Sequence, residues 1–269
     1  MTVDRGTMHG FPWVAIGSGP PVVLLAGLAP VTGFRTPGSA RAALAPLRQV
    51  ADRRRVFALN RRSGLAADLT MSGFAAEHAA AFRAFFDAPV DLVGVSTGGS
   101  IAAQIAADHP DVVRRLVLIS SACRLGPVGR KSQADVAGAL RAGRPRAAGA
   151  IVARALIPAA GWLAGCGGWL VGARAFGAEA DRADLVATIE AEDGFDLARC
   201  RSPISAPTLI VGGQRDRFYP PDLFAETAAL IPGSSLVTVP RRGHLGVTRD
   251  RRALARITGF LTWEPTDAR

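Results

Sequence analysis

The chain has 269 residues, of which 49% are hydrophobic and 20% charged, and its formal net charge is +10. This size and composition fit one large α/β domain with an insertion and exclude an extensively disordered chain. The positive charge does not indicate nucleic-acid binding. The arginines are scattered, and aromatic side chains that stack on bases are not interleaved with them.

The cysteines and histidines are widely separated. Cys123, Cys166 and Cys200 form no C-x-x-C pair, which favours a reducing compartment, so we expect a cytoplasmic location. The four histidines form no pair with the spacing of metal ligands, and we expect no metal. The first apolar run is short and follows two prolines, so neither a signal peptide nor an anchor is expected.

Strand-like and helical segments alternate through the first half of the chain. Short apolar runs of buried-strand length occur at 22–25, 56–59, 90–95 and 116–119. Helical patterns lie between them at 72–87, which Pro89 ends, and at 100–108. This rhythm predicts a mostly parallel central sheet with right-handed crossovers and helices on both faces.

The rhythm breaks in the middle of the chain and then resumes. Residues 124–202 are rich in Ala, Gly and Arg and contain no convincing strand, whereas strands are predicted again at 208–211 and 235–239. We therefore predict an α/β core formed by 1–123 and 203–269. Residues 124–202 are predicted to be a helical cap inserted into that core.

One stretch of the cap, 155–173, contains no charged residue. As a helix it would be roughly 28 Å long, which is near membrane-spanning length. It also has the G-x-x-x-G spacing found at close helix contacts, for example at Gly161 and Gly165. Pro158 and the glycines argue against spanning. The favoured interpretation is short helices over a substrate pocket, with membrane-surface contact as the alternative.

The segment Gly94-Val95-Ser96-Thr97-Gly98 is a G-x-S-x-G pattern between a predicted strand and a predicted helix. The pattern predicts a turn so sharp that the serine backbone is strained and its hydroxyl projects from the sheet. Side chains at Gly94 and Gly98 would clash with neighbouring elements. The backbone N–H of Thr97, at the start of the helix, faces the place where an oxyanion would form.

With this motif, the chain resembles the α/β-hydrolase fold family over nearly its whole length. Residues 17–28 resemble the early strand and oxyanion loop of the family, 206–216 resemble the strand and loop that deliver the acid, and Gly243-His244 resembles the histidine loop. The order of Ser, Asp and His along the chain is the order that this family uses.

The resemblance implies a role for each matched residue. Ser96 would be the nucleophile, His244 its general base, and Asp216 the carboxylate that orients the histidine. The backbone N–H groups of Leu28 and Thr97 would form the oxyanion hole.

Other residues of the matched region are interpreted structurally. Ala26-Gly27 stands where the family often has His-Gly, which leaves open how the oxyanion loop is braced. Asp222 follows two prolines and is predicted to lie in the first turn of a helix. The acidic residues late in the cap are predicted to form a solvated helix face: Asp184, Glu190, Glu192 and Asp193.

The expected activity is hydrolysis of a carboxylic ester, or of a related acyl bond such as a thioester or lactone. The acyl-enzyme would form on Ser96. Trp162, Trp169 and Phe176 of the cap are predicted to line an apolar pocket, which favours a small to medium apolar substrate.

Two alternatives stay open at this point. The same triad would also serve a cofactor-free haloperoxidase, an acyltransferase or a C–C hydrolase, and a non-catalytic ligand-binding protein could keep the fold. The expected partner is a small-molecule acyl substrate, and the oligomeric state does not follow from the sequence. No cofactor is expected, because the glycines at 94–99 do not form a dinucleotide fingerprint.

Overall fold

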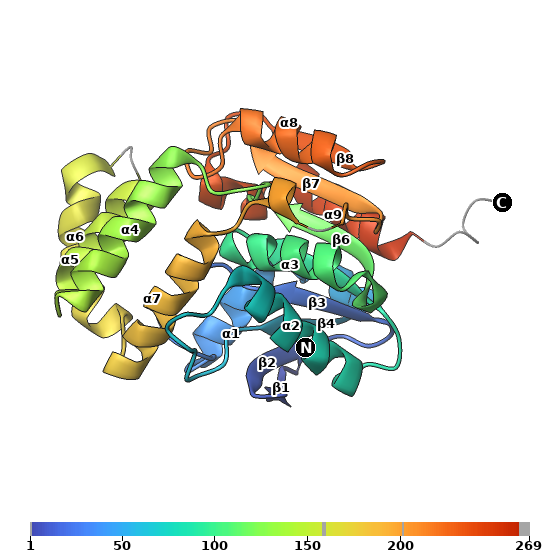
Figure 1. Cartoon of the computed structure of the whole chain (residues 1–269), viewed down its shortest axis with the longest axis horizontal. Coiled ribbons are helices and arrows are strands. Elements are labelled where there is room, and N and C mark those ends of the chain that lie inside the picture. The colour runs from blue at the N-terminus through green and yellow to red at the C-terminus, as the bar shows by residue number, and fades with distance from the viewer. Residues whose placement is uncertain (1, 158–159, 201, 264–269) are drawn as a thin grey trace.

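The computed structural model describes residues 2–157, 160–200 and 202–263, which contain an eight-stranded sheet with helices on both faces (Figure 1). The strands are β1 (Asp4–Met8), β2 (Phe11–Ile16), β3 (Pro21–Leu25), β4 (Arg55–Leu59), β5 (Val90–Val95), β6 (Val113–Ile119), β7 (Thr208–Gly213) and β8 (Ser235–Val239). Their order across the sheet is β1-β2-β4-β3-β5-β6-β7-β8. β1 and β2 pair antiparallel, as do β2 and β4, and all other neighbours pair parallel.

Helices cover both faces of this sheet. The helices of the described residues are α1 (Pro37–Leu44), α2 (Met71–Phe85), α3 (Thr97–Asp108), α4 (Pro127–Arg141), α5 (Pro145–Leu156), α6 (Gly161–Ala175), α7 (Glu179–Asp193), α8 (Pro221–Leu230) and α9 (Arg251–Thr262). Short 3-10 turns are η1 (Ala45–Leu47), η2 (Val50–Asp52), η3 (Pro110–Val112), η5 (Leu197–Arg199) and η6 (His244–Arg249). The predicted α/β fold with a mostly parallel sheet is confirmed.

The alternation of side chains along the central strands explains the two layers of helices. Val22 and Leu24 face one side of the sheet and pack in a cluster with residues of α1 and α9. Val23 and Leu25 face the other side and pack with residues of α2, α3 and α8. Both faces of β3 are therefore buried, which is why its sequence is a continuous apolar run rather than an alternating one.

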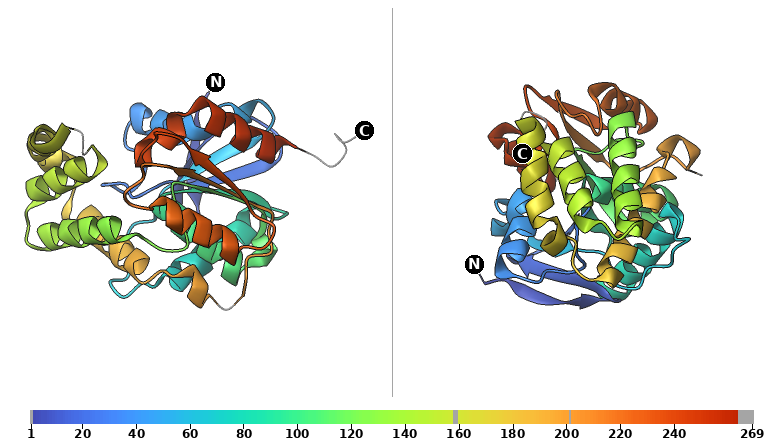
Figure 2. Two further views of the ribbon diagram at one scale, coloured as in Figure 1. Left: turned by 90° about the horizontal axis from the view of Figure 1, so that it is seen from above. Right: turned by 90° about the vertical axis from the view of Figure 1, so that its left-hand side faces the viewer.

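Helices α4 to α7, here called the α4–α7 insertion, lie between β6 and β7 along the chain. They stand to one side of the sheet, with α5 and α6 farthest from it (Figure 2). No strand occurs between β6 and β7 in the part of this segment that the structure describes. Within residues 2–157, 160–200 and 202–263, no helix combines the length and apolar character needed to cross a bilayer.

The predicted solvated acidic face of the insertion is wrong for two of its four residues. Glu190 and Asp193 are exposed, but Asp184 and Glu192 are buried. Burial of Asp184 is compensated by the backbone N–H groups of Gly64 and Leu65, which donate to its two oxygens at 3.2 and 2.8 Å. A buried carboxyl group that has such partners avoids most of the cost of leaving water.

Glu192 is completely buried and joins α7 to three other parts of the fold. Its carboxyl oxygens accept hydrogen bonds from Thr97 Oγ1 (2.8 Å) and Ser100 Oγ (2.9 Å) of α3, and from Gln133 Nε2 (2.7 Å) of α4. The fourth donor is the hydroxyl of Tyr219, at 2.7 Å, in the segment before α8. One side chain therefore fixes the insertion against the first turn of α3.

We expect Glu192→Met to lower the free energy of unfolding by about 3 kcal/mol or more, because it leaves four buried donors without their acceptor. Urea unfolding followed by circular dichroism measures this loss. The matched control is Glu190→Met, two residues earlier in the same helix. It removes only an exposed ion pair with Arg141 and should change stability little. Equal losses in the two variants would contradict this role of Glu192.

His78 of α2 is a buried histidine that lies among aromatic side chains. Its ring centroid is 4.2 Å from that of Phe11, and Phe74 and Phe82 flank it. Its Nδ1 donates a hydrogen bond to the carbonyl oxygen of Phe74 at 2.8 Å. Burial in this apolar setting lowers the pKa of His78 to about 4, because the charged imidazolium would lose its hydration.

This lowered pKa makes stability depend on pH. The unfolded chain, in which a histidine has a pKa of about 6.5, binds more protons at this position than the folded chain between pH 6.5 and 4. The free energy of unfolding therefore falls as pH falls. At pH 5, the loss due to His78 is about 2 kcal/mol relative to neutral pH. In urea unfolding, the free energy of unfolding should drop less between pH 7.5 and pH 5.0 for His78→Phe than for the native chain. An identical drop in both proteins would assign the pH dependence to other groups.

Candidate active site

The turn from β5 to α3 forces Ser96 into an unusual backbone conformation, with φ 53° and ψ −126°. A residue other than glycine in this region costs about 1–3 kcal/mol, and the surroundings must hold it there. A Cβ atom on Gly94 would lie 2.4 Å from the carbonyl oxygen of Gly98, and one on Gly98 would lie 2.2 Å from that of Leu25. Glycine at both positions is therefore a steric requirement of this turn.

His244 begins η6 and lies beside Ser96. Its Nε2 is 3.0 Å from Ser96 Oγ, and its Nδ1 is 2.8 Å from Asp216 Oδ2. The imidazole ring stacks on Phe218 with centroids 4.8 Å apart, and the Ser120 hydroxyl donates to the backbone carbonyl of His244 at 2.9 Å. Stacking on Phe218 thus holds the face of the imidazole ring, and the hydrogen bond from Ser120 holds the backbone of His244.

Asp216 follows β7, and its side chain is fully buried. Its Oδ1 accepts hydrogen bonds from the backbone N–H groups of Phe218 (2.9 Å) and Tyr219 (3.1 Å). These donors occupy one oxygen and leave Oδ2 to accept from Nδ1–H of His244. The proton on Nδ1 leaves the lone pair of Nε2 directed at the Ser96 hydroxyl. The structure therefore brings the three predicted residues together in one hydrogen-bonded chain.

The loop after β3 runs beside the serine. A Cβ atom on Gly27 would lie 3.3 Å from the Cβ of Ser96, so the loop backbone passes at close range. In the described part of the chain, the backbone N–H groups of Leu28 and Thr97 donate no hydrogen bond. Both residues predicted to form the oxyanion hole thus have a free donor near Ser96.

Two residues after β4 brace this loop, which answers the question that Ala26 raised. Arg61 Nη1 donates to the carbonyl oxygen of Ala29 at 2.6 Å, and Asn60 Nδ2 donates to those of Val31 and Gly33 at 3.4 and 3.2 Å. Burial lowers the pKa of Arg61 to about 10, against the opposing effect of nearby carboxylates, so its guanidinium is charged at neutral pH. In the sequence, Arg61 is one of two adjacent arginines that follow the predicted strand at 56–59, and nothing in that pattern indicates this contact.

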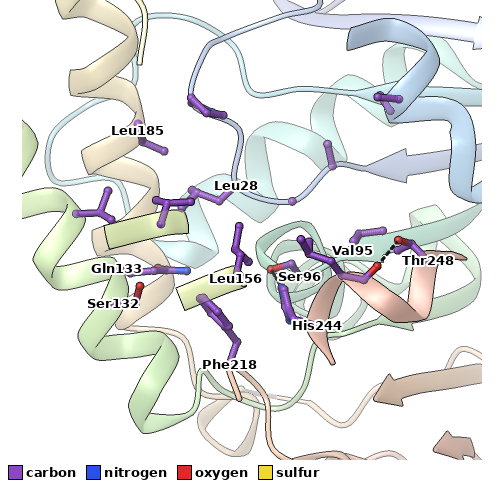
Figure 3. A pocket seen from close by; sticks show the side chains of 18 of the residues that line it. Leu28, Val95, Ser96, Ser132, Gln133, Leu156, Leu185, Phe218, His244 and Thr248 are labelled. Carbon is purple, nitrogen blue, oxygen red and sulfur yellow. Dashed lines mark hydrogen bonds between the residues drawn. The ribbon is translucent and has the colours of Figure 1, made fainter. Parts of the chain in front are cut away.

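A cavity of about 310 Å³ opens above Ser96 and His244, between the core and the α4–α7 insertion (Figure 3). Most of its wall is apolar, and Ser132 and Gln133 of α4 add polar groups. The apolar lining includes Leu28, Pro30, Val136, Val152, Leu156, Phe176, Leu185 and Phe218. No cluster of His, Cys, Asp and Glu able to hold a metal ion is found in the residues that the structure describes.

The three predicted pocket residues of the cap lie in different places. Phe176 is buried and lines the cavity. Trp162 and Trp169 do not line it: they project from α6 with 70% and 47% of their surface exposed. Their position differs from the expectation because α6 turns its glycines, not its large side chains, toward α5.

Comparisons with known proteins agree with this fold. Among curated proteins, a pyrrolizixenacetamide deacetylase of Xenorhabdus hominickii is 27% identical over 68% of this chain and 70% of its own length. A Klebsiella pneumoniae protein named as a carbamate hydrolase is 31% identical over 67% of this chain and 68% of its own.

Solved structures give the same answer for the fold. The enol-lactonase from Burkholderia xenovorans superposes with a TM-score of 0.73 over 97% of this chain and all of its own, at 20% identity. An alpha/beta hydrolase enzyme from a deep-sea metagenome library gives a TM-score of 0.74 at 17% identity, over 96% of this chain and 95% of its own. The family model described as alpha/beta hydrolase family matches residues 9–257, and the chain belongs to that family.

Proposed function

We propose that this chain is a serine hydrolase that cleaves a carboxylic ester or a related acyl bond through an acyl-enzyme on Ser96. The observation that carries the proposal is the hydrogen-bonded chain from Asp216 through His244 to Ser96, which ends at the floor of the cavity. The relatives named as a deacetylase and a carbamate hydrolase support it, because each name describes a bond to a carbonyl carbon.

In the first step, Ser96 Oγ attacks the substrate carbonyl carbon while its proton passes to Nε2 of His244. The carbonyl electron pair moves onto oxygen, and the backbone N–H groups of Leu28 and Thr97 stabilise the resulting oxyanion. Asp216 stabilises the imidazolium that forms. The oxyanion then collapses, and His244 returns the proton to the leaving group as the C–X bond breaks.

In the second step, water takes the place of the leaving group. His244 accepts a proton from water as its oxygen attacks the acyl carbon, and the second collapse expels Ser96 Oγ, which regains its proton from Nε2. The carboxylic acid is released and the free serine is restored.

The cavity favours an apolar acyl group of small to medium size. Its volume of about 310 Å³ and its aliphatic and aromatic lining match an aliphatic chain better than a highly charged group. Both Phe176 and Leu185, at the side formed by the insertion, are buried and apolar.

Ser96→Ala should abolish covalent labelling by a fluorophosphonate probe and lower kcat for a p-nitrophenyl ester by about 10⁴-fold or more, because it removes the nucleophile. In-gel fluorescence and steady-state kinetics measure the two effects. The matched control is Ser132→Ala, a serine that lines the same cavity from α4 and should still leave the protein labelled (Figure 3).

The labelling experiment also separates catalysis from binding alone. A well-folded native protein that the probe does not label, and that turns over no acyl ester, would contradict the proposed nucleophile. It would leave a ligand-binding member of the family as the better description.

Val152→Phe should shift the preference toward shorter acyl chains, because Val152 lines the cavity and a larger side chain would shorten it. We expect the ratio of kcat/KM for the octanoyl ester to that for the acetyl ester to fall by about tenfold. Val128→Phe, on an exposed part of α4, is the control and should leave the ratio unchanged. An unchanged ratio in Val152→Phe would argue that the acyl group does not occupy this cavity.

A further inference from the structure

Helix α6 has the reverse of the usual distribution of side chains on a surface helix. Its buried residues are Gly165, Gly168 and Gly172. Its large apolar side chains point to solvent, and together they form what is called here the α6 face: Trp162, Leu163, Trp169, Leu170 and Val171. Surface helices ordinarily bury such side chains and expose polar ones. An exposed apolar patch of this kind marks an interaction surface.

The packing of α6 on α5 explains why these side chains point outward. A Cβ atom on Gly149 would lie 2.2 Å from the carbonyl oxygen of Gly168, and one on Gly168 would lie 2.2 Å from that of Gly149. A Cβ atom on Gly172 would lie 2.6 Å from the carbonyl oxygen of Pro145. The two backbones are in direct contact, so no large side chain fits between them. The α6 face consequently has no covering element in the described part of the chain.

The surroundings of the α6 face are positively charged. Residues 136–178 contain no Asp, Glu or Lys, and all of their charges are arginines: Arg141, Arg144, Arg146, Arg154 and Arg174. The formal net charge of this part of the chain is therefore +5, against +10 for the whole chain. Arg146 stacks over the ring of Trp169, 4.7 Å from its centroid, and Arg141 pairs with Glu190. Helices α5 and α6, which carry Arg146, Arg154 and Arg174, lie farthest from the sheet (Figure 2).

We propose that the α6 face docks onto the surface of an anionic lipid bilayer. Trp162, Trp169 and the neighbouring aliphatic side chains would enter the boundary between headgroups and acyl chains, while arginines contact lipid phosphates. Stable attachment to a bilayer surface generally needs both apolar insertion and basic charge, and this surface supplies both. This inference is independent of the chemistry at Ser96.

Charge also decides between a bilayer and a second copy of the chain. Self-association through the α6 face would bring two groups of arginines together with no acidic partner from residues 136–178, and like charges across an interface are unfavourable. An anionic headgroup layer is complementary to the same surface. Docking would also place α5, which lines the cavity through Val152 and Leu156, one helix away from the lipid.

The test is flotation of the full chain with vesicles of phosphatidylcholine alone or mixed with phosphatidylglycerol. We expect binding to the mixed vesicles that weakens as salt is raised, and weaker binding to the neutral ones. The double variant Trp162→Ser/Leu170→Ser changes two highly exposed side chains, so its fold should be kept, which circular dichroism verifies. Its partition onto mixed vesicles should fall by about tenfold or more. The control Trp263→Ser changes a tryptophan after α9 that is 52% exposed, and this variant should bind like the native chain.

Three results would overturn the proposal. The first is a native chain that binds neither type of vesicle, and the second is a double variant that binds mixed vesicles as well as the native chain. The third is a native dimer that the double variant dissociates in the absence of any vesicle binding. That result would assign the α6 face to a second copy of the chain.

Discussion

The close backbone contact at the turn between β5 and α3 is the constraint on which the site depends. Gly98 touches the backbone at the end of β3, and a Cβ atom on Gly99 would lie 2.3 Å from the Cβ of Ser121, just after β6. One helical turn is therefore pressed against the ends of both strands that flank β5. The neighbouring Ser120 in turn holds the backbone of His244. A larger side chain at Gly98 or Gly99 would move Ser96 away from the loop after β3 and from the segment after β6.

Buried polar groups connect this turn to the α4–α7 insertion. Glu192 reaches from α7 to Thr97, the residue directly after Ser96, while Arg61 reaches from the loop after β4 to Ala29 and to the carbonyl oxygen of Asp181. Since the same insertion forms a wall of the cavity, the position of the wall and that of the serine turn are set by shared contacts. Both oxygens of the Glu192 carboxylate accept hydrogen bonds, so the part of this network that holds Thr97 is satisfied.

Much of the fold was predictable from local sequence patterns. Strands β3, β4, β5 and β6 contain apolar runs because both faces of the sheet are covered. Gly94 and Gly98 indicated the sharp turn, because a side chain at either position would have no room. Ser96 was recognisable from its G-x-S-x-G turn, and Asp216 and His244 from the resemblance of their loops to those of the α/β-hydrolase fold family. All three lie beyond the ends of strands, and the carboxyl ends of parallel strands meet at one edge.

The remainder depends on contacts between distant parts of the chain. Glu192 resembles its exposed neighbours in sequence, and only its partner Thr97, 95 residues away, makes its burial favourable. Trp162 and Trp169 belong to an apolar stretch whose periodicity does not show which side faces inward. The choice was made by backbone contact at Gly168, where space and not hydrophobicity decides.

The connection from β6 to β7 has a consequence for how new specificities can arise. The helices that form one wall of the cavity belong to one uninterrupted stretch of the chain, while Ser96, Asp216 and His244 all lie outside it. Because the entropy of closing a connection grows only slowly with its length, such a stretch tolerates exchange and extension at small cost. The wall of the cavity and the hydrogen-bonded residues beside it can thus change separately in this chain, provided that a replacement segment also supplies an acceptor for the hydroxyl of Thr97.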